Sequence, residues 1–201
     1  MSLRPVGTTL VAALVLAGCG AEDSGEEDAP ITSADRPSAT SASGTLAPPE
    51  SANGAFTYDP AQAPADATLA VEIVESDEST TVELTVDGMQ PDRGYAAHAH
   101  TDPCGADGAA AGPHFQHEVD PAATADEPST DPAYANPDNE IWLDLRTDDT
   151  GSGTASTEVP FRFGDREPAS VVVHANPTTA TGPGEAGKAG DRLACLTIDQ
   201  R

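Results

Sequence analysis

The sequence predicts an all-β domain of eight strands, folded as a Greek-key β-barrel or sandwich with two long loops. From residue 55 onward, short alternating or β-branched runs recur between clusters of Asp, Gly and Pro, which is typical of such folds. No convincing amphipathic helix interrupts these runs. The expected domain, residues 55–201, has the usual size of one β-domain. Its strands are expected at 55–59, 67–75, 79–87, 93–100, 140–147, 153–160, 169–174 and 191–198.

The second and third runs give the clearest strand signal, because apolar and polar residues alternate in them with a period of two. Residues 67–74 read Ala-Thr-Leu-Ala-Val-Glu-Ile-Val, and residues 80–86 read Thr-Thr-Val-Glu-Leu-Thr-Val. The short gap at 75–79 predicts a hairpin turn, and residues 148–151 predict another.

Two connections, 101–139 and 175–190, are too long to be turns. Loops of this length in a compact domain are usually functional or disordered. His114 lies within the first connection, and the second begins directly after His174. We therefore expect a site built by loops over a rigid sheet.

Residues 1–18 are expected to be a lipoprotein signal peptide. Arg4 supplies a positive charge before an apolar run that ends at Ala17, and this run is too short to span a bilayer. Leu-Ala-Gly at 16–18 precedes Cys19, which is the expected lipidation site; an ordinary cleaved signal is the alternative. We therefore expect an exported protein, lipid-anchored at the cell envelope, that meets the membrane only through Cys19.

Residues 19–54 are expected to form a disordered acidic linker that follows the lipidated cysteine. Between 20 and 54, Ile31 and Leu46 are the only large apolar residues. Such a stretch buries too little surface to offset its conformational entropy.

The charge of the chain is strongly acidic, with 34 Asp and Glu against 9 Lys and Arg, a formal net charge of −25. This balance disfavours nucleic acid and anionic lipid as partners. The default interpretation is an acidic surface that keeps the protein soluble.

Four of the five histidines follow a pattern that can hold one copper ion. His98 and His100 lie two apart in an expected strand, so they share one face. His114 lies in a loop framed by Gly and Pro, and His174 ends a β-branched run. Three distant segments would then converge on a four-imidazole site of the kind that copper accepts.

The order of these motifs resembles that of the copper/zinc superoxide dismutases. It comprises His-Ala-His at 98–100, a cysteine at 104, Gly-Pro-His-Phe at 112–115, a strand ending at 174, and Gly-Asp-Arg-Leu-Ala-Cys at 190–195. The resemblance covers residues 55–201 and implies an eight-stranded Greek-key barrel with its copper site under two long loops. The positions that match the family's copper ligands are His98, His100, His114 and His174.

The resemblance also implies a disulfide and two catalytic residues. Cys104 and Cys195 match the disulfide that pins the metal-site loop to the last strand, and they are the even pair left beside a lipidated Cys19. Arg192 matches the arginine that guides the superoxide anion. With His114 it is the expected catalytic pair for dismutation of superoxide to oxygen and hydrogen peroxide.

The zinc site of the family has no match here. In the family, the histidine matching His114 bridges copper and zinc, and two more histidines and an aspartate complete the zinc site. Here only His117 follows, too early to match either zinc histidine, and Asn-Pro-Asp-Asn-Glu stands at 136–140. The aspartate that links the two sites also lacks a counterpart in Asn-Pro-Thr-Thr-Ala-Thr at 176–181. We therefore expect a copper-only member with no zinc.

Without zinc, a carboxylate or water from residues 116–140 would have to orient His114. Glu118 and Glu140 are the candidates. His117 is expected to be a solvated loop histidine, and Lys188 either extends the positive strip of Arg192 or is solvated as well.

Two other functions fit parts of the pattern. A copper-binding lipoprotein that stores or delivers metal would keep the histidines but would not need Arg192. A structural β-sandwich for adhesion would need neither. The sequence makes no prediction about the oligomeric state.

Overall fold

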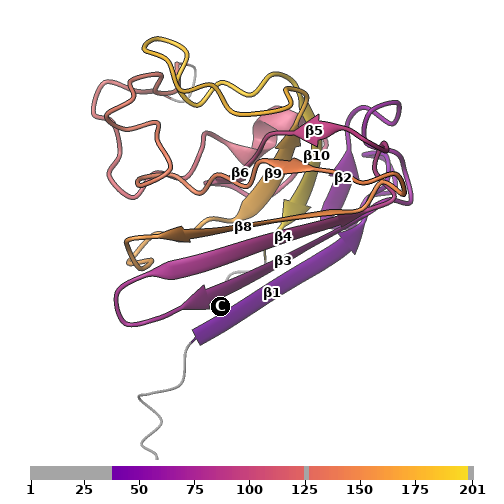
Figure 1. The fold of residues 1–201 in the computed structure, drawn as a ribbon, viewed down its shortest axis with the longest axis horizontal. Coiled ribbons are helices and arrows are strands. Elements are labelled where there is room, and N and C mark those ends of the chain that lie inside the picture. The colour runs from indigo at the N-terminus through magenta and orange to yellow at the C-terminus, as the bar shows by residue number, and fades with distance from the viewer. Residues whose placement is uncertain (1–37, 125–126, 199–201) are drawn as a thin grey trace, which may run out of the picture. The chain divides into compact units, whose positions relative to one another are not determined.

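Two four-stranded antiparallel sheets form the body of the protein, and two long connections gather beside one of them (Figure 1). The structure, a computed structural model, describes residues 38–124 and 127–198. The first sheet contains, in spatial order, β1 (Ser38–Thr45), β3 (Thr68–Glu75), β4 (Thr80–Asp87) and β8 (Gly153–Val159). The second contains β2 (Ala55–Thr57), β10 (Arg192–Thr197), β9 (Ser170–His174) and β6 (Ala97–His100).

Little else in the described chain is regular. A two-residue ladder pairs β5 (Gly94–Tyr95) with β7 (Leu145–Arg146), and a single 3-10 turn, η2, covers Gly108–Ala111. The all-β prediction is thus confirmed. In the part of the chain that the structure covers, no helix is long and apolar enough to cross a membrane.

The core lies between the two sheets and follows the alternation read from the sequence. In β3 and β4 every second side chain is buried, and the two strands pair over their full length, from Thr68 opposite Asp87 to Glu75 opposite Thr80. The second sheet buries Ala97, Ala99 and alternate valines of β9 against the same cluster. Tyr95, fully buried, fills space beside the small alanines. The side chains on the other face of β6 and β9 are therefore available for a site.

The predicted disordered linker is wrong at its C-terminal end. Residues 38–45 form the edge strand β1, which pairs with β3 over all eight residues, and Leu46 is 1% exposed in the core. The strand was missed because its side chains are small, and it is held by backbone pairing along the edge of the sheet. The expected signal peptide, Cys19 and the rest of the linker lie outside the described residues.

The strand boundaries differ from prediction near the site. The expected strand 93–100 is divided into β5 and β6 because the amide of Ala96 leaves the ladder and donates to Asn176 O at 2.7 Å. The expected strand 140–147 is reduced to β7 and to isolated bridges at Glu140 and Trp142. Two residues of this irregular stretch, Glu140 and Trp142, have side chains that contact the histidines.

A chain that begins at residue 55, the predicted start of the domain, should be less stable than one that begins at residue 38. It lacks β1, which leaves the edge of β3 unpaired, and it lacks Leu46, whose burial contributes about 1.5–3 kcal/mol. Urea unfolding should show a loss of at least about 2 kcal/mol. Equal unfolding midpoints for the two chains would contradict the role given to β1.

Candidate metal centre

The second sheet places three histidines on its outer face, the face turned away from the core. Because Ala97 and Ala99 point into the core, His98 and His100 point away from it. In β9, which pairs with β6, alternation likewise turns His174 outward. The loop that carries His114 is held against β6, where Phe115 N donates to Ala99 O at 2.9 Å.

The four histidines predicted as ligands do meet. One ligand atom from each lies within 4.8 Å of the others. His98 and His100 are fully buried, His174 is 4% exposed, and His114 is partly exposed. Among residues 38–124 and 127–198, this is the sole group of three or more His, Cys, Asp or Glu placed to hold a metal ion.

Each imidazole has one nitrogen bonded to an oxygen of the surrounding protein. Nδ1 of His100 bonds Gly112 O at 3.0 Å, and Nδ1 of His174 bonds Gly190 O at 3.3 Å. A carbonyl oxygen can only accept, so these nitrogens carry the proton and the Nε2 lone pair faces the cluster. The remaining two bonds join His114 Nδ1 to Glu140 Oε2 at 2.9 Å and His98 Nε2 to Thr179 Oγ1 at 2.6 Å.

The inward nitrogens fit a metal ion. His98 Nδ1 is buried with no hydrogen-bond partner. His100 Nε2 and His174 Nε2 lie 3.3 Å apart, although both should present lone pairs. A cation between them would convert this repulsion into coordination, and imidazole suits copper, zinc, iron and nickel. The donor set therefore matches a metal held by His98 through Nδ1 and by the other three through Nε2.

Burial keeps these rings neutral. Desolvation lowers the pKa of His98 and His100 well below 6.5, and repulsion among the histidines and from Arg192 adds to the effect. The same causes, led by desolvation, lower the pKa of His174 to about 3. Neutral imidazole is the form that binds metal, so these three rings are in the metal-binding form at neutral pH.

Of the two glutamates predicted as candidates to orient His114, Glu140 is the one that contacts it. Its Oε2 also accepts from Trp142 Nε1, and its Oε1 accepts from Gln116 Nε2, both at 2.8 Å. Glu140 is 1% exposed, and three donors satisfy its buried oxygens. Glu118 instead uses its backbone, which bonds the Asn139 side chain in both directions.

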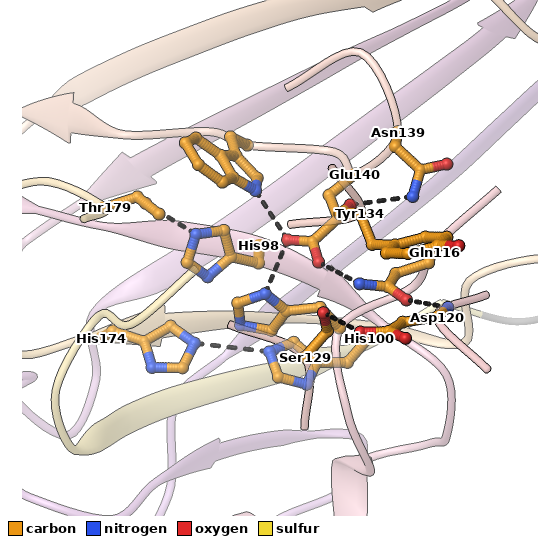
Figure 2. A network of polar contacts seen from close by, with 12 residues as sticks. His98, His100, Gln116, Asp120, Ser129, Tyr134, Asn139, Glu140, His174 and Thr179 are labelled. Atoms are coloured by element: carbon orange, nitrogen blue, oxygen red, sulfur yellow. Dashed lines mark hydrogen bonds and ion pairs between the residues drawn. The ribbon is translucent and has the colours of Figure 1, made fainter. Parts of the chain in front are cut away.

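A polar network extends outward from Glu140 (Figure 2). Gln116 Oε1 accepts from Asp120 N at 3.1 Å, and Asp120 Oδ2 accepts from Ser129 Oγ at 2.6 Å. Asn139 donates to Tyr134 O at 2.8 Å. The long first loop is therefore an ordered support for His114.

Thr179 and Asp144 orient His98, and neither residue stands in a sequence pattern that predicts this role. Thr179 Oγ1 accepts from His98 Nε2 and donates to Asp144 Oδ1 at 2.6 Å, while Thr179 N donates to Asp144 Oδ2 at 2.7 Å. The second long connection has no counterpart of the family's linking aspartate, and it supports His98 through the hydroxyl of Thr179.

Arg192 reaches the site because of a register shift in β10. Ala194 and Leu196 point into the core, so regular alternation would turn Arg192 inward as well; the shift between Arg192 and Ala194 turns it outward. Its Nη1 donates to Gly108 O at 2.7 Å and its Nη2 to Gly112 O at 2.6 Å. Gly112 O therefore accepts from both Arg192 and His100.

Cys104 and Cys195 form the expected disulfide, with an S–S distance of 2.03 Å. It joins the first long connection to β10 across 91 residues of sequence. Closing a loop of this length stabilises the fold by about 4–5 kcal/mol in the chain-entropy account.

Two of the four histidines line a cleft of about 720 Å³. Its lining includes His114, His174 and Arg192, together with Lys188, whose Nζ lies 2.8 Å from Glu185. His117 stays outside the cluster and stacks on Phe161, with ring centroids 4.3 Å apart. A small anion entering the cleft would meet Arg192 beside two of the candidate ligands.

The family model described as copper/zinc superoxide dismutase (SODC) matches residues 67–198, about two thirds of the sequence. The chain belongs to the copper/zinc superoxide dismutase family. The resemblance inferred from the motifs is thereby confirmed, and the matched range contains every candidate ligand, both bridged cysteines and Arg192.

Solved structures similar to this chain include members of the same family at low identity. Cu/Zn superoxide dismutase from Brucella abortus is 16% identical, with 81% of this chain and all of that chain covered and a TM-score of 0.47. A double mutant of a SOD-like protein from Bacillus subtilis is 17% identical, with 64% of this chain and 87% of that chain covered and a TM-score of 0.45. Among curated proteins, none matches the sequence significantly.

The metal-free protein should lose stability as the pH falls below about 6.5, the pKa of a histidine in the unfolded chain. The folded-state pKa values of His98, His100 and His174 lie lower, so the unfolded state binds more protons and unfolding becomes easier. Each such histidine contributes about 1.4 kcal/mol per pH unit until its own pKa is reached. Chemical unfolding at pH 7.5, 6.5 and 5.5 measures this slope.

Two variants test the assignment of that slope. His174→Gln should reduce it by about a third, since one of three contributing histidines is removed, whereas His117→Gln, outside the cluster, should leave it unchanged. Constant stability from pH 7.5 to 5.5 would contradict the neutral, buried state of the cluster.

Proposed function

We propose that the protein is a copper-dependent superoxide dismutase of the cell envelope, which converts superoxide to oxygen and hydrogen peroxide. The observation that carries this proposal is the convergence of four imidazole nitrogens on one point, with two of the histidines, His114 and His174, lining a cleft together with Arg192. The family of the chain supports the same activity.

A copper-only site is supported by the use of His114 Nδ1. In a site with zinc, this nitrogen would bind the second metal; here it bonds Glu140. His117, Glu118 and Asp120 do not come together as a further metal group within the described residues. We therefore propose one copper ion per chain, held by His98, His100, His114 and His174, with no zinc.

Copper bound there would supply the one-electron chemistry by which one superoxide is oxidised and a second is reduced. Arg192 attracts and orients the anion in the cleft, and its two carbonyl bonds fix the guanidinium in place. The distant acidic residues oppose this only weakly, because charges beyond about 8 Å are largely screened at physiological salt. His114 and Glu140 form a dyad that can hold a proton at the edge of the site.

The location at the envelope rests on the sequence alone. The apolar run before Cys19 supports export and lipid anchoring, and the lipid would be the only membrane contact. A store or carrier of copper on the same fold is the alternative function, and the presence of Arg192 in the cleft favours the enzyme.

The copper-loaded, disulfide-bonded protein should dismutate superoxide. Metal analysis after loading with copper and zinc together should give about one copper and no tightly held zinc, since the described residues hold a single four-ligand group. Arg192→Ala should slow turnover and reduce its salt dependence while copper stays bound, and Arg162→Ala is the matched control because Arg162 does not line the cleft. An inert loaded protein would indicate storage instead.

Glu140→Gln should weaken the site, because the new amide is a poorer acceptor for His114 Nδ1 and Trp142 Nε1. Loss of a group that orients a metal-bound histidine typically lowers metal affinity or activity about 10–100-fold. Competition titration with a copper chelator and the pH profile of turnover measure the two effects. Glu118→Gln is the matched control, and indistinguishable results for the two variants would contradict the role of Glu140.

A further inference from the structure

The cleft over the histidines is far larger than superoxide requires. It encloses about 720 Å³, whereas one water molecule takes about 30 Å³ of liquid volume, and a diatomic anion is of similar scale. Cavities of 300–1,000 Å³ with mostly apolar walls and a few convergent polar groups typically bind small organic molecules.

Part of the wall is apolar and open to solvent. Val119 is 57% exposed, and among the described residues it is the one large hydrophobic side chain left exposed. Beside it in the lining lie Ala123 and Pro128 from the same loop, and Ala186 from the second connection. An organic ligand in contact with these residues would remove apolar surface from water.

The same cleft collects positive charge in a strongly acidic protein. The described residues contain six Lys and Arg side chains, and three of them line the cleft: Arg166, Lys188 and Arg192. Among the described residues, the one acidic side chain in the lining is Glu140, whose two oxygens already accept three hydrogen bonds. Asp165 and Glu167 flank Arg166 in sequence but do not line the cleft. Lys188 is paired with Glu185, so Arg166 and Arg192 carry the positive charge that favours an anion in the cleft.

Arg166 is the cation best placed to bind an anion other than superoxide. Its Nη2 donates to Gln116 O at 2.9 Å and to His117 O at 3.0 Å, and its guanidinium lies 5.4 Å from the centre of the Phe115 ring. These contacts hold an exposed side chain in position through one terminal nitrogen. In Arg192, by contrast, both terminal nitrogens already bond carbonyls. The planar guanidinium matches a carboxylate in geometry.

We propose that the cleft binds a small organic carboxylate, with its charge on Arg166 and its apolar body against Val119 and Pro128. This site does not depend on electron transfer and goes beyond the proposed dismutation. Because the same cleft leads to His114 and His174, a bound carboxylate competes with superoxide for access to the histidines.

Calorimetric titration of the copper-loaded full chain with three probes tests the proposal. Benzoate carries both features of the ligand, acetate lacks the apolar body, and benzyl alcohol lacks the charge. Benzoate should saturate one site per chain, and each of the other probes should bind at least about tenfold more weakly, the scale of one lost charged hydrogen bond or buried apolar group.

Variants then locate the site. Arg166→Gln should weaken benzoate about tenfold, as expected for loss of a charge-assisted pair. Arg162→Gln is the matched control, since Arg162 is exposed, lies near Glu75 and does not line the cleft. Val119→Thr keeps the branched shape but adds a hydroxyl, and it should weaken benzoate and leave acetate unchanged.

Four results would overturn the proposal: no saturable benzoate binding, acetate binding as tightly as benzoate, benzyl alcohol binding as tightly as benzoate, or equal effects of Arg166→Gln and Arg162→Gln. Dismutation is measured separately and with superoxide. A protein that binds benzoate but lacks turnover would therefore refute the proposed function and leave the carboxylate site standing.

Discussion

The candidate centre depends on one hydrogen bond at the outer nitrogen of each histidine. That bond fixes which nitrogen is protonated and therefore which one faces the cluster. The four acceptors are Gly112 O, Glu140, Thr179 and Gly190 O, and all belong to connections between strands. The sheets thus decide where the histidine backbones lie, and the loops decide how the rings are turned. This division explains why a rigid β-domain needs two long ordered loops.

Much of the fold follows from side-chain patterning, and the exceptions have a common cause. Strands β3 and β4 could be predicted because their large apolar residues alternate along a buried face. Strand β1 could not, because Ser, Ala, Thr and Gly carry no such pattern and the strand is held by its backbone partner. The break between β5 and β6 likewise comes from a backbone bond to Asn176, eighty residues away in sequence. Contacts of the backbone with distant segments leave no local signal.

The candidate site could likewise be predicted only where a local pattern or the family motif marks its residues. The pairing of His98 with His100 on one face follows from period-two alternation, and the family motif adds His114, His174 and the disulfide. Alternation alone would have placed Arg192 in the core, since it lies two residues before Ala194; a bulge reverses it. Thr179 and Asp144 meet only because two loops close on each other, and neither has a distinctive sequence context. Residues that support ligands are therefore harder to find than the ligands.

Gly112 joins two parts of the centre that have separate tasks. Its carbonyl oxygen accepts from His100 Nδ1 and from Arg192 Nη2, so a candidate metal ligand and the cation proposed to guide the anion bond the same oxygen. Its φ of +70° and the position a Cβ would take, 2.1 Å from Asp102 Oδ2, exclude any larger residue without rearrangement. A displacement of this single peptide would alter metal binding and anion capture together. The orientation of His100 and that of Arg192 therefore depend on the same peptide. A variant that changes one without the other must alter a different residue.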